Sequence, residues 1–177
     1  MMVPLAEAVD ASRFGGKASA LAHAINAGLP VPRGFALSPE AAERIASGEP
    51  DSALTTELAR LAPLFAVRSS ATGEDGAVAS FAGQFATKLG VIPSGVAAAV
   101  REVVASGAAA AGYQTRIGSS AGVRMAVVIQ ELIVPHCAGV LFTNNPSRGA
   151  DARVIEAAYG LGEAVVSCRV TPDLYRV

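Results

Sequence analysis

The segment LFAVRSSATGEDG, residues 64–76, passes from an apolar run to a polar loop within a few positions. Its first half is short and apolar and therefore predicts a buried strand. Arg68 stands inside that run, where its charge needs a partner because burying an unpaired charge is unfavourable. Phosphate oxygens suit a planar guanidinium with serine hydroxyls beside it, and an ion pair with Glu74 or Asp75 in a structural loop would serve equally well. The segment alone leaves both interpretations open.

Lys17 is a second charged residue in an unusual position, and it is one of only two lysines in the chain. It follows Gly15 and Gly16 and begins an alanine-rich helical pattern that we expect to stop at Gly28. The helix dipole disfavours a cation at this end by roughly a few tenths of a kcal/mol. A bound anion would remove that conflict, since helix N-termini and ammonium groups both attract phosphate. The alternative is a turn followed by a solvated lysine, and the spacing is not that of a P-loop.

The rest of the chain alternates irregularly between helical and extended patterns. Helical patterns dominate the first half and strand patterns the second, without a regular strand–helix alternation, which predicts an α+β fold with a mixed or antiparallel sheet. Glycines at 107 and 112 predict interruptions in the helix expected at 94–116, and residues 159–167 read as a Gly-rich bend followed by extended chain. Beyond the first helix, we expect helices at 38–48, with Ser38 as the N-cap, at 51–61 and at 94–116. We expect strands at 64–70, 86–91, 124–134 and 152–159, and another within 137–149 that ends in a turn.

Two further segments carry residue types that suit a ligand. SFAGQFAT, residues 80–87, combines small residues and a hydroxyl around Gly83, which is typical of a mobile flap and also of an ordinary β-turn. VVIQELIV, residues 127–134, ends a buried strand with Gln130 and Glu131. The backbone of such a strand end could pair with the edge of an adenine, or the strand could simply emerge from the core. Nothing local decides between these alternatives.

The remaining polar candidates are isolated from one another in the sequence. Glu163 lies beside two glycines, where it could serve a ribose, a metal or a turn. His23 falls within the first helical pattern and His136 in a loop, so they form no catalytic or metal-binding motif. Cys137 and Cys168 are too few for a disulfide framework or a zinc site. We expect both cysteines to be buried and reduced, which favours a cytoplasmic location.

Composition excludes several classes of protein. Of 177 residues, 51% are hydrophobic and 16% charged, which is enough apolar material for a folded core. The net charge is −1 and the arginines are scattered, so no basic stripe indicates nucleic acid. No segment approaches the ~18 apolar residues of a membrane-spanning helix. The N-terminus lacks the pattern of a secretion signal.

Four segments, taken together and in this order, closely resemble the N-terminal ATP-binding region of phosphoenolpyruvate synthase, pyruvate phosphate dikinase and rifampicin phosphotransferase. The resemblance runs from about residue 12 to the end and is poor only between Gly90 and Arg124. The segments are GGKASALAHAINAGLPVPRGFAL, VRSSATGEDGAVASFAGQFAT, AVVIQELIVPHCAGVLFTNNPSRG and VIEAAYGLGEAVVSCRVTPDLYRV.

The resemblance implies which residues hold the phosphates of ATP. Lys17 would contact them, as the lysine of the family's Gly-Gly-Lys motif does. Arg68 matches the phosphate-binding arginine of Val-Arg-Ser-Ser, and these two residues would be the catalytic ones. Thr87, with Gly83 and Gln84, matches the flap over the phosphates.

The resemblance also implies how the nucleoside is held. Gln130, Glu131 and Ile133 match the hinge that reads adenine, with Glu131 and Ile133 acting through the backbone. Glu163 matches the glutamate of the family's Gly-Leu-Gly-Glu segment. ATP is thus the expected cofactor, together with Mg²⁺, whose ligands we expect outside this chain.

The fold implied by the resemblance is ATP-grasp, in which the nucleotide lies between lobes. We expect an α+β structure with mixed or antiparallel sheets and flanking helices that lacks the C-terminal part of that fold. Residues 1–63 would form an N-terminal helical part and residues 64–177 a sheet-rich part, together making one compact ATP-binding unit. The function implied is that of the ATP-binding portion of a dikinase-type phosphotransferase, similar to pyruvate,water dikinase, which phosphorylates a histidine on a swivelling domain.

Two departures from the family pattern bear on this expectation. Asn145 replaces an acidic residue before a proline, and the chain stops at Val177, before the family's magnesium-binding Glu and Gln. Glu74 and Asp75 are the nearest local carboxylates, and we do not expect them to substitute. We therefore expect the chain alone to be incomplete for catalysis and to act with a phosphohistidine domain and an acceptor domain. The alternatives are a rifampicin phosphotransferase-like domain and a non-catalytic nucleotide-binding module that acts with a partner chain.

Overall fold

The computed structural model describes residues 1–49, 52–72, 86–116, 124–143 and 153–176. Their contacts divide the chain into two units, Met1–Leu132 and Ile133–Val177. This division falls after Leu132 and not after residue 63, where the sequence analysis placed it. The reason is that strands from the first 63 residues belong to the same sheet as later strands.

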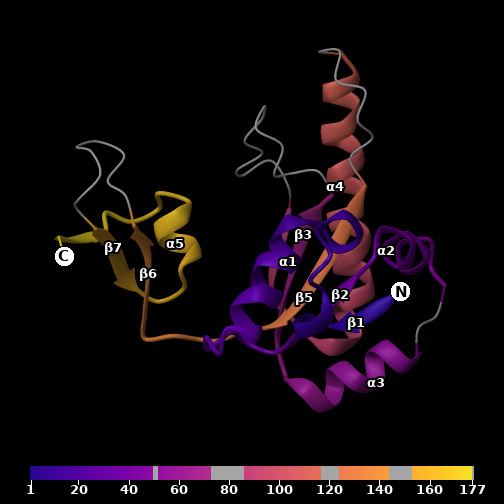
Figure 1. Ribbon diagram of the computed structural model, residues 1–177, viewed down its shortest axis with the longest axis horizontal. Coiled ribbons are helices and arrows are strands. Elements are labelled where there is room, and N and C mark those ends of the chain that lie inside the picture. The colour runs from indigo at the N-terminus through magenta and orange to yellow at the C-terminus, as the bar shows by residue number, and fades with distance from the viewer. Residues whose placement is uncertain (50–51, 73–85, 117–123, 144–152, 177) are drawn as a thin grey trace. The chain divides into compact units, whose positions relative to one another are not determined.

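Unit 1 is built on a five-stranded antiparallel sheet with the order β1–β2–β5–β3–β4, and Figure 1 shows its strands side by side. β3 and β5 are its centre and pair over seven residues, from Phe65 opposite Glu131 to Ala71 opposite Met125. Both are the apolar runs from which the sequence predicted strands, and that prediction is confirmed. The five strands are β1 (Met2–Pro4), β2 (Gly34–Leu37), β3 (Phe65–Ala71), β4 (Thr87–Val91) and β5 (Met125–Glu131).

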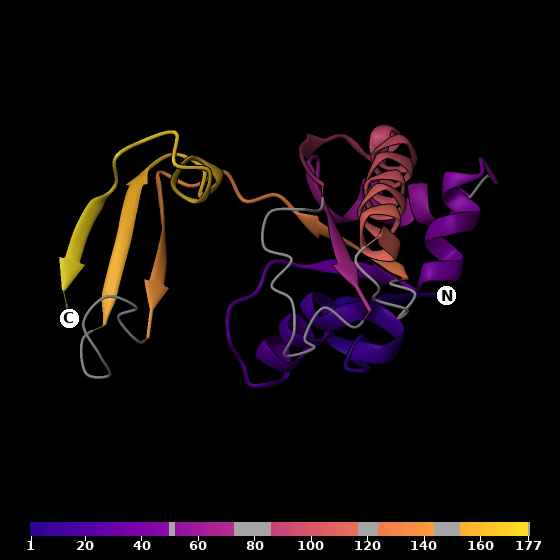
Figure 2. The ribbon, with the colours of Figure 1, turned by 90° about the horizontal axis from the view of Figure 1, so that it is seen from above.

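Helices cover both faces of this sheet, so unit 1 has three layers. α1 lies on one side and α4 on the other, as Figure 2 shows. The α1 side buries a small cluster that includes Phe14, Ala18 and Val128. The opposite side buries a larger cluster between the sheet and three helices, which includes Leu58, Phe65 and Ile129. The helices are α1 (Ala11–Asn26), α2 (Pro39–Ala46), α3 (Ser52–Leu61) and α4 (Val96–Arg116), with short 3-10 turns at η1 (Leu5–Glu7) and η2 (Pro93–Gly95).

The ends of the helices follow from local sequence. Ser38 caps α2, since its side chain accepts a hydrogen bond from the Ala41 N–H. α1 ends where Gly28 adopts a φ of 79°, a left-handed conformation that favours glycine. Both features were predicted and are confirmed. Inside α1, Gly15 also has a φ of 79° and divides the element into two helices across a kink.

α4 differs from its prediction, because it runs without interruption from Val96 to Arg116. Gly107 does not break it, and instead brings the helix close to the side chain of Met125 on β5. Its small size thus serves packing between helix and sheet and not chain reversal. No helix within the described ranges is long and apolar enough to cross a membrane.

Unit 2 is a three-stranded antiparallel sheet with the order β6–β7–β8 and one short helix. The helix α5 replaces the extended chain predicted after the Gly-rich bend, because Gly162 allows a helical turn to begin there. Cys137 and Cys168 are free and exposed, which contradicts the prediction of buried thiols; a thin sheet with one turn of helix buries few side chains. The elements are β6 (Cys137–Phe142), β7 (Val154–Tyr159), α5 (Glu163–Val166) and β8 (Asp173–Arg176).

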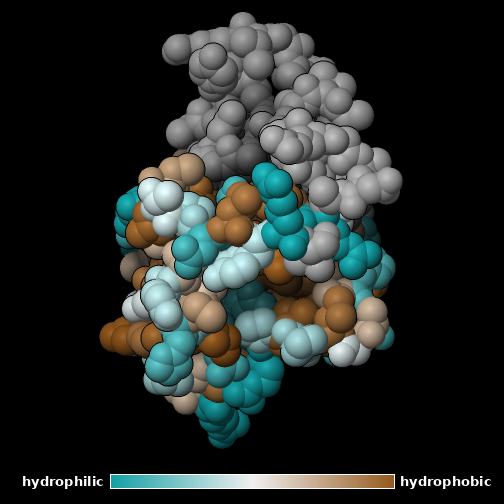
Figure 3. All heavy atoms as spheres, turned by 90° about the vertical axis from the view of Figure 1, so that its left-hand side faces the viewer, coloured by the Kyte–Doolittle hydropathy of each residue, from teal (hydrophilic) through white to brown (hydrophobic). Residues whose placement is uncertain are grey.

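The surface mixes residue types. Figure 3 shows hydrophobic and hydrophilic residues interspersed over one face of the molecule. In unit 2, exposed large hydrophobic residues include Leu141, Tyr159 and Tyr175. Single exposed apolar side chains of this kind are normal for a folded protein.

Candidate functional site

β3 delivers Arg68 to the face of the sheet that α1 covers. Side chains alternate between the two faces of a strand, and residues directly opposite each other share a face. Arg68 pairs with Val128 on β5, and Val128 is buried in the cluster against α1. Arg68 therefore lies on the α1 face, whereas Phe65 and Val67 pack into the larger cluster on the other side.

Arg68 is only partly exposed to solvent. The side chain is half-buried, and this burial lowers the pKa of its guanidinium from the ordinary value. An arginine keeps its charge in proteins in spite of such a shift. Within the described ranges no carboxylate pairs with it, while the alternative partners Glu74 and Asp75 lie outside them. The described chain thus holds a partly desolvated cation on the α1 face.

Thr87 lies directly opposite Arg68 at the beginning of β4. The shared register places both on the same face, and Thr87 is exposed there. Its hydroxyl can donate one hydrogen bond to a phosphate oxygen and accept others. Gly83 and Gln84, which the sequence analysis assigned to the same flap, lie outside the described residues.

Lys17 reaches the same strand from α1. Its ammonium Nζ donates a hydrogen bond of 2.7 Å to the main-chain carbonyl of Ser69, the residue after Arg68. The side chain is half-buried. The structure therefore brings together Lys17 and Arg68, which are separated by 51 positions in the sequence, at adjacent residues of β3.

Ser70 has a role different from the one that the sequence suggested. The hydroxyl was grouped with those that could meet phosphate, but it is fully buried. It donates to the carbonyl of Phe14 at 2.7 Å and accepts from the N–H of Ala18 at 3.0 Å. It binds the main chain on both sides of the kink in α1, so both its donor and an acceptor position are taken.

The end of β5, where the hinge was predicted, is held by main-chain and side-chain contacts. The buried side chain of Gln130 donates from Nε2 to the carbonyl of Pro32 at 2.9 Å. The N–H of Glu131 donates to the carbonyl of Arg33 at 2.8 Å. The Arg33 guanidinium in turn contacts the Glu131 carboxylate at 3.2 Å and the Leu61 carbonyl at 2.9 Å.

Arg33 was not singled out in the sequence. A signal was present, since an arginine between Pro32 and Gly34 follows a proline-rich extended segment. That signal could not identify its partner, because Glu131 lies 98 positions further on. The fold fixes the predicted hinge through a residue that only the tertiary structure could reveal.

Two predicted site residues belong to unit 2 and are described within it. Ile133 is its first residue and is exposed. Glu163 begins α5, and its carboxylate lies 3.7 Å from the guanidinium of Arg169. Both side chains of that pair are substantially exposed, so it contributes little to stability.

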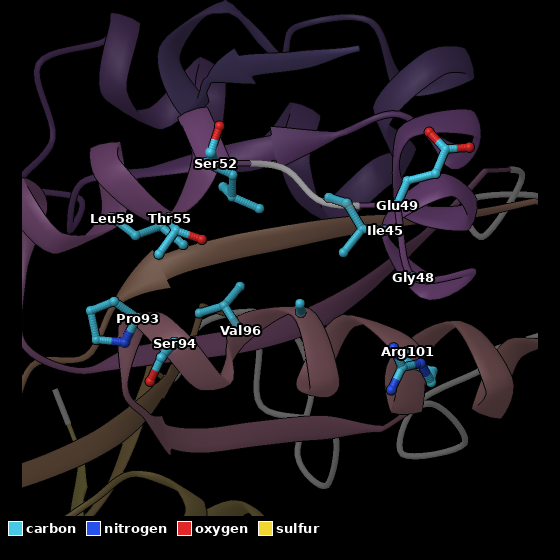
Figure 4. Close-up of a pocket in the computed structure, with 12 residues that line it drawn as sticks. Ile45, Gly48, Glu49, Ser52, Thr55, Leu58, Pro93, Ser94, Val96 and Arg101 are labelled. Atoms are coloured by element: carbon cyan, nitrogen blue, oxygen red, sulfur yellow. The ribbon is translucent and has the colours of Figure 1, made fainter.

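A hollow lies on the side of unit 1 opposite to α1. Figure 4 shows its walls, formed by α2, α3 and the beginning of α4. Leu58 and Val96 line it together with polar residues such as Arg101, whose Nε donates to the Ala46 carbonyl at 2.9 Å. This hollow is separate from the face that carries Lys17 and Arg68, because the sheet lies between them.

Potential metal ligands are dispersed over the described residues. Nowhere in those ranges do three His, Cys, Asp or Glu side chains gather in a way that could hold a metal ion. Chemically, the α1 face offers an ammonium, a partly desolvated guanidinium and an exposed hydroxyl. Such a set can bind an anion with several oxygens, such as phosphate.

Comparison with known proteins identifies a family model and several relatives that this chain matches. The family model of the pyruvate phosphate dikinase AMP/ATP-binding domain matches residues 51–177. A rifampicin phosphotransferase of Streptomyces sviceus is 44% identical over 134 residues, which cover 71% of this chain and 15% of that protein. A phosphoenolpyruvate synthase of Aeropyrum pernix is 33% identical over 218 residues, which cover 92% of this chain and 26% of that protein.

A third relative is named for a different activity. The prodigiosin synthesizing transferase PigC of Serratia marcescens is 37% identical over 201 residues, which cover 94% of this chain and 22% of that protein. The chain spans between 15% and 26% of the length of these three relatives.

Proposed function

The chain belongs to the family of the pyruvate phosphate dikinase AMP/ATP-binding domain, and on this premise we propose that it binds ATP with Lys17 and Arg68 on the phosphates. The observation that carries the proposal is the convergence of the two cations on adjacent residues of β3. Thr87 shares that face and would add a hydroxyl contact. A guanidinium and an ammonium on one anion supply the charge-assisted hydrogen bonds that bind phosphate most strongly.

For the nucleoside, we assign the recognition of adenine to the hinge at the end of β5. The Glu131 N–H already donates to Arg33, so the carbonyl of Glu131 is the group we expect to accept from the adenine amine. Ile133 would donate through its N–H. Gln130 holds the strand in place through Pro32, and its contribution to adenine would be indirect. Gly83, Gln84 and Glu163 keep the roles that the family resemblance implies for them.

The relatives include a rifampicin phosphotransferase and a phosphoenolpyruvate synthase, and the activity of a whole protein of this family is also part of the proposal. We propose an ATP-grasp fold in which the ATP-binding portion passes phosphate to a histidine on a swivelling domain, as in phosphoenolpyruvate synthase. Mg²⁺, when bound, would neutralise the charge of the moving phosphate. The described residues offer no cluster of ligands for it, and we expect its ligands outside this chain. The cytoplasm is the expected location.

The described residues do not determine which molecule accepts the phosphate. The similarity to a rifampicin phosphotransferase favours an alternative in which the same ATP-binding portion serves an antibiotic hydroxyl. A non-catalytic module that binds ATP and acts with a partner chain would use the same Lys17 and Arg68. These alternatives share the ATP site and differ in the domains that act with it.

The test of ATP binding uses the two lysines of the chain as a matched pair. Titration calorimetry with a non-hydrolysable ATP analogue, with and without Mg²⁺, measures the affinity of the 177-residue chain. We expect Lys17→Ala to raise the Kd about tenfold or more, since it removes a charge-assisted contact. Lys88 is the matched control, because it pairs with Glu102 on α4, and Lys88→Ala should leave the Kd unchanged. Equal affinities of both variants and the wild type would contradict the proposal.

A further inference from the structure

We propose that Ser70 is the positioning residue of the ATP site, which holds the Gly15–Ala18 turn so that Lys17 meets the phosphates. The inference rests on the proposed function, since it takes Lys17 as the phosphate ligand. In this proposal Ser70 contacts no ligand itself and acts through the main chain of α1.

The first support is the double hydrogen bond of the Ser70 hydroxyl. It donates to the carbonyl of Phe14, before the kink, at 2.7 Å, and it accepts from the N–H of Ala18, after the kink, at 3.0 Å. A carbonyl at the end of one helix and an N–H at the beginning of the next are groups that have no partner within their own helices. One buried side chain thus satisfies both and fixes the relative direction of the two helical segments.

The second support is the contact of Gly15 with the same residue. A Cβ atom at Gly15 would overlap the carbonyl group and the side-chain oxygen of Ser70. Gly15 also has a φ of 79°, in the left-handed region that side chains disfavour. The first glycine of the Gly-Gly-Lys motif therefore serves the close approach of the turn to Ser70, and not the approach of backbone to a ligand.

The consequence for Lys17 follows from its place between these contacts. Residue 17 lies between Gly15 and Ala18, both of which are fixed against Ser70. Its ammonium bonds the carbonyl of Ser69, the neighbouring residue of β3. Two successive residues of β3 therefore set the Lys17 main chain and side chain, and Arg68 precedes them on the same strand. Ser70 couples the position of one phosphate ligand to the strand that carries the other.

Removing the hydroxyl should separate this role from general stability. In Ser70→Ala, the Phe14 carbonyl and the Ala18 N–H lose their partner while the strand and its pairing remain. We expect the Kd for the ATP analogue to rise about tenfold, and the Kd for adenosine, which lacks phosphates, to change less than about twofold. Hydrogen exchange at the Ala18 amide should accelerate, because the hydrogen bond that protects it is gone.

Ser19→Ala is the matched control. Ser19 is another buried serine, on the same helix, and its hydroxyl donates to the Val9 carbonyl at 2.7 Å. This bond reaches the chain ahead of α1 and leaves the hydrogen bonds of the Phe14 carbonyl and the Ala18 N–H in place, so its loss should leave the ratio of ATP to adenosine affinity unchanged. If both variants changed that ratio equally, Ser70 would be an ordinary structural serine and the inference would be overturned.

A double-mutant cycle with Lys17 gives the decisive measurement. If Ser70 acts through Lys17, then Ser70→Ala should lower the ATP affinity of the wild type about tenfold but that of Lys17→Ala less than about twofold. Equal losses in both backgrounds would overturn the inference. Should Ser70→Ala fail to fold, Ser70→Cys takes its place in the same cycle, since the thiol keeps a weak donor and a weak acceptor at this position.

The outcomes distinguish this inference from the proposed function. If the wild type and Lys17→Ala bind the ATP analogue equally, the proposed function fails. If Lys17→Ala weakens binding and Ser70→Ala does not, the proposed function stands and the inference alone fails.

Discussion

The two faces of the sheet in unit 1 bury different kinds of side chain. Towards α2, α3 and α4 the strands present large apolar residues, among them Phe65, Val67 and Ile129, which are fully buried. Towards α1 the same strands present Arg68, Ser70 and Gln130, each polar and each placed by hydrogen bonds or register. β3 supplies residues to both faces, because successive side chains of a strand point to opposite faces of the sheet. The comparison indicates that one face mainly stabilises the fold and that the other positions the candidate site.

The largest effect should come from the apolar face. Phe65→Ala removes a fully buried ring and should lower the free energy of unfolding by about 3–5 kcal/mol. Urea denaturation followed by far-UV circular dichroism measures it, because α1 to α4, the longest helices among the described residues, belong to unit 1. Leu29→Ala is the control, since Leu29 is exposed and its loss should change the free energy by less than about 0.5 kcal/mol. A similar loss in both variants would remove the distinction between the faces.

The next effect should come from the polar face and should appear in binding. Arg68→Ala should raise the Kd for an ATP analogue about 10–100-fold, because it removes charge-assisted hydrogen bonds worth roughly 1.5–3 kcal/mol. The free energy of unfolding should fall by less than about 1 kcal/mol. Arg60→Ala is the matched control, since Arg60 is exposed on α3 and pairs with Glu57. A large loss of stability without a change in Kd would make Arg68 a structural residue.

A smaller effect is expected at the end of the sheet. Arg33 joins the Glu131 carboxylate to the Leu61 carbonyl at the end of α3. Arg33→Ala should lower the free energy of unfolding by no more than about 1 kcal/mol, since the ion pair is largely exposed. The Kd for ATP should change less than about threefold, because the main-chain bond from Glu131 to residue 33 remains. Calorimetric titration and urea denaturation of the same samples test both statements, and a tenfold loss of affinity would show that the guanidinium shapes the hinge.

The smallest effect should be a dependence of stability on pH at the beginning of α2. A hydrogen bond from Ser38 and the guanidinium of Arg124 lower the pKa of Glu40 from 4.5 to about 2. A carboxyl whose pKa is lower in the folded state stabilises the fold above the unfolded pKa, and this contribution disappears as the pH falls through the folded pKa. The stability advantage of the wild type over Glu40→Gln should therefore be complete above pH 4.5 and disappear as the pH falls through about 2. Urea denaturation across that range measures it, and a constant difference would contradict the assigned cause.

Much of the local structure could be predicted from the sequence. The Ser38 cap, the stop at Gly28 and the strands around Val67 and Val128 depend on neighbouring residues, and the structure confirms them. Where a local prediction was wrong, packing between segments that are distant in the sequence determined the structure. Gly107 faces Met125 and stays helical, and the first helix is kinked because Gly15 meets Ser70.

The candidate site also has features that could be predicted from the sequence and features that could not. The residue types of the Gly-Gly-Lys and Val-Arg-Ser-Ser motifs indicated phosphate chemistry, and their order indicated the family that the comparisons show. The sequence could not tell that the hydroxyl of Ser70 is used within the protein. Nor could it find the contact of Arg33 with Glu131 at the end of β5, since both contacts join residues more than fifty positions apart.

By itself, therefore, the sequence determined most of the long helices, the central strands, the α+β class and the family, because hydrophobic periodicity, capping and motifs act over a few residues. The tertiary structure alone decided that Lys17 meets the strand of Arg68 and that Ser70 holds the turn between them. These decisions required the burial of α1 against β3 and β5. The alternation of β3 assigns each side chain to a face, but only the packing of helices determines what that face contains.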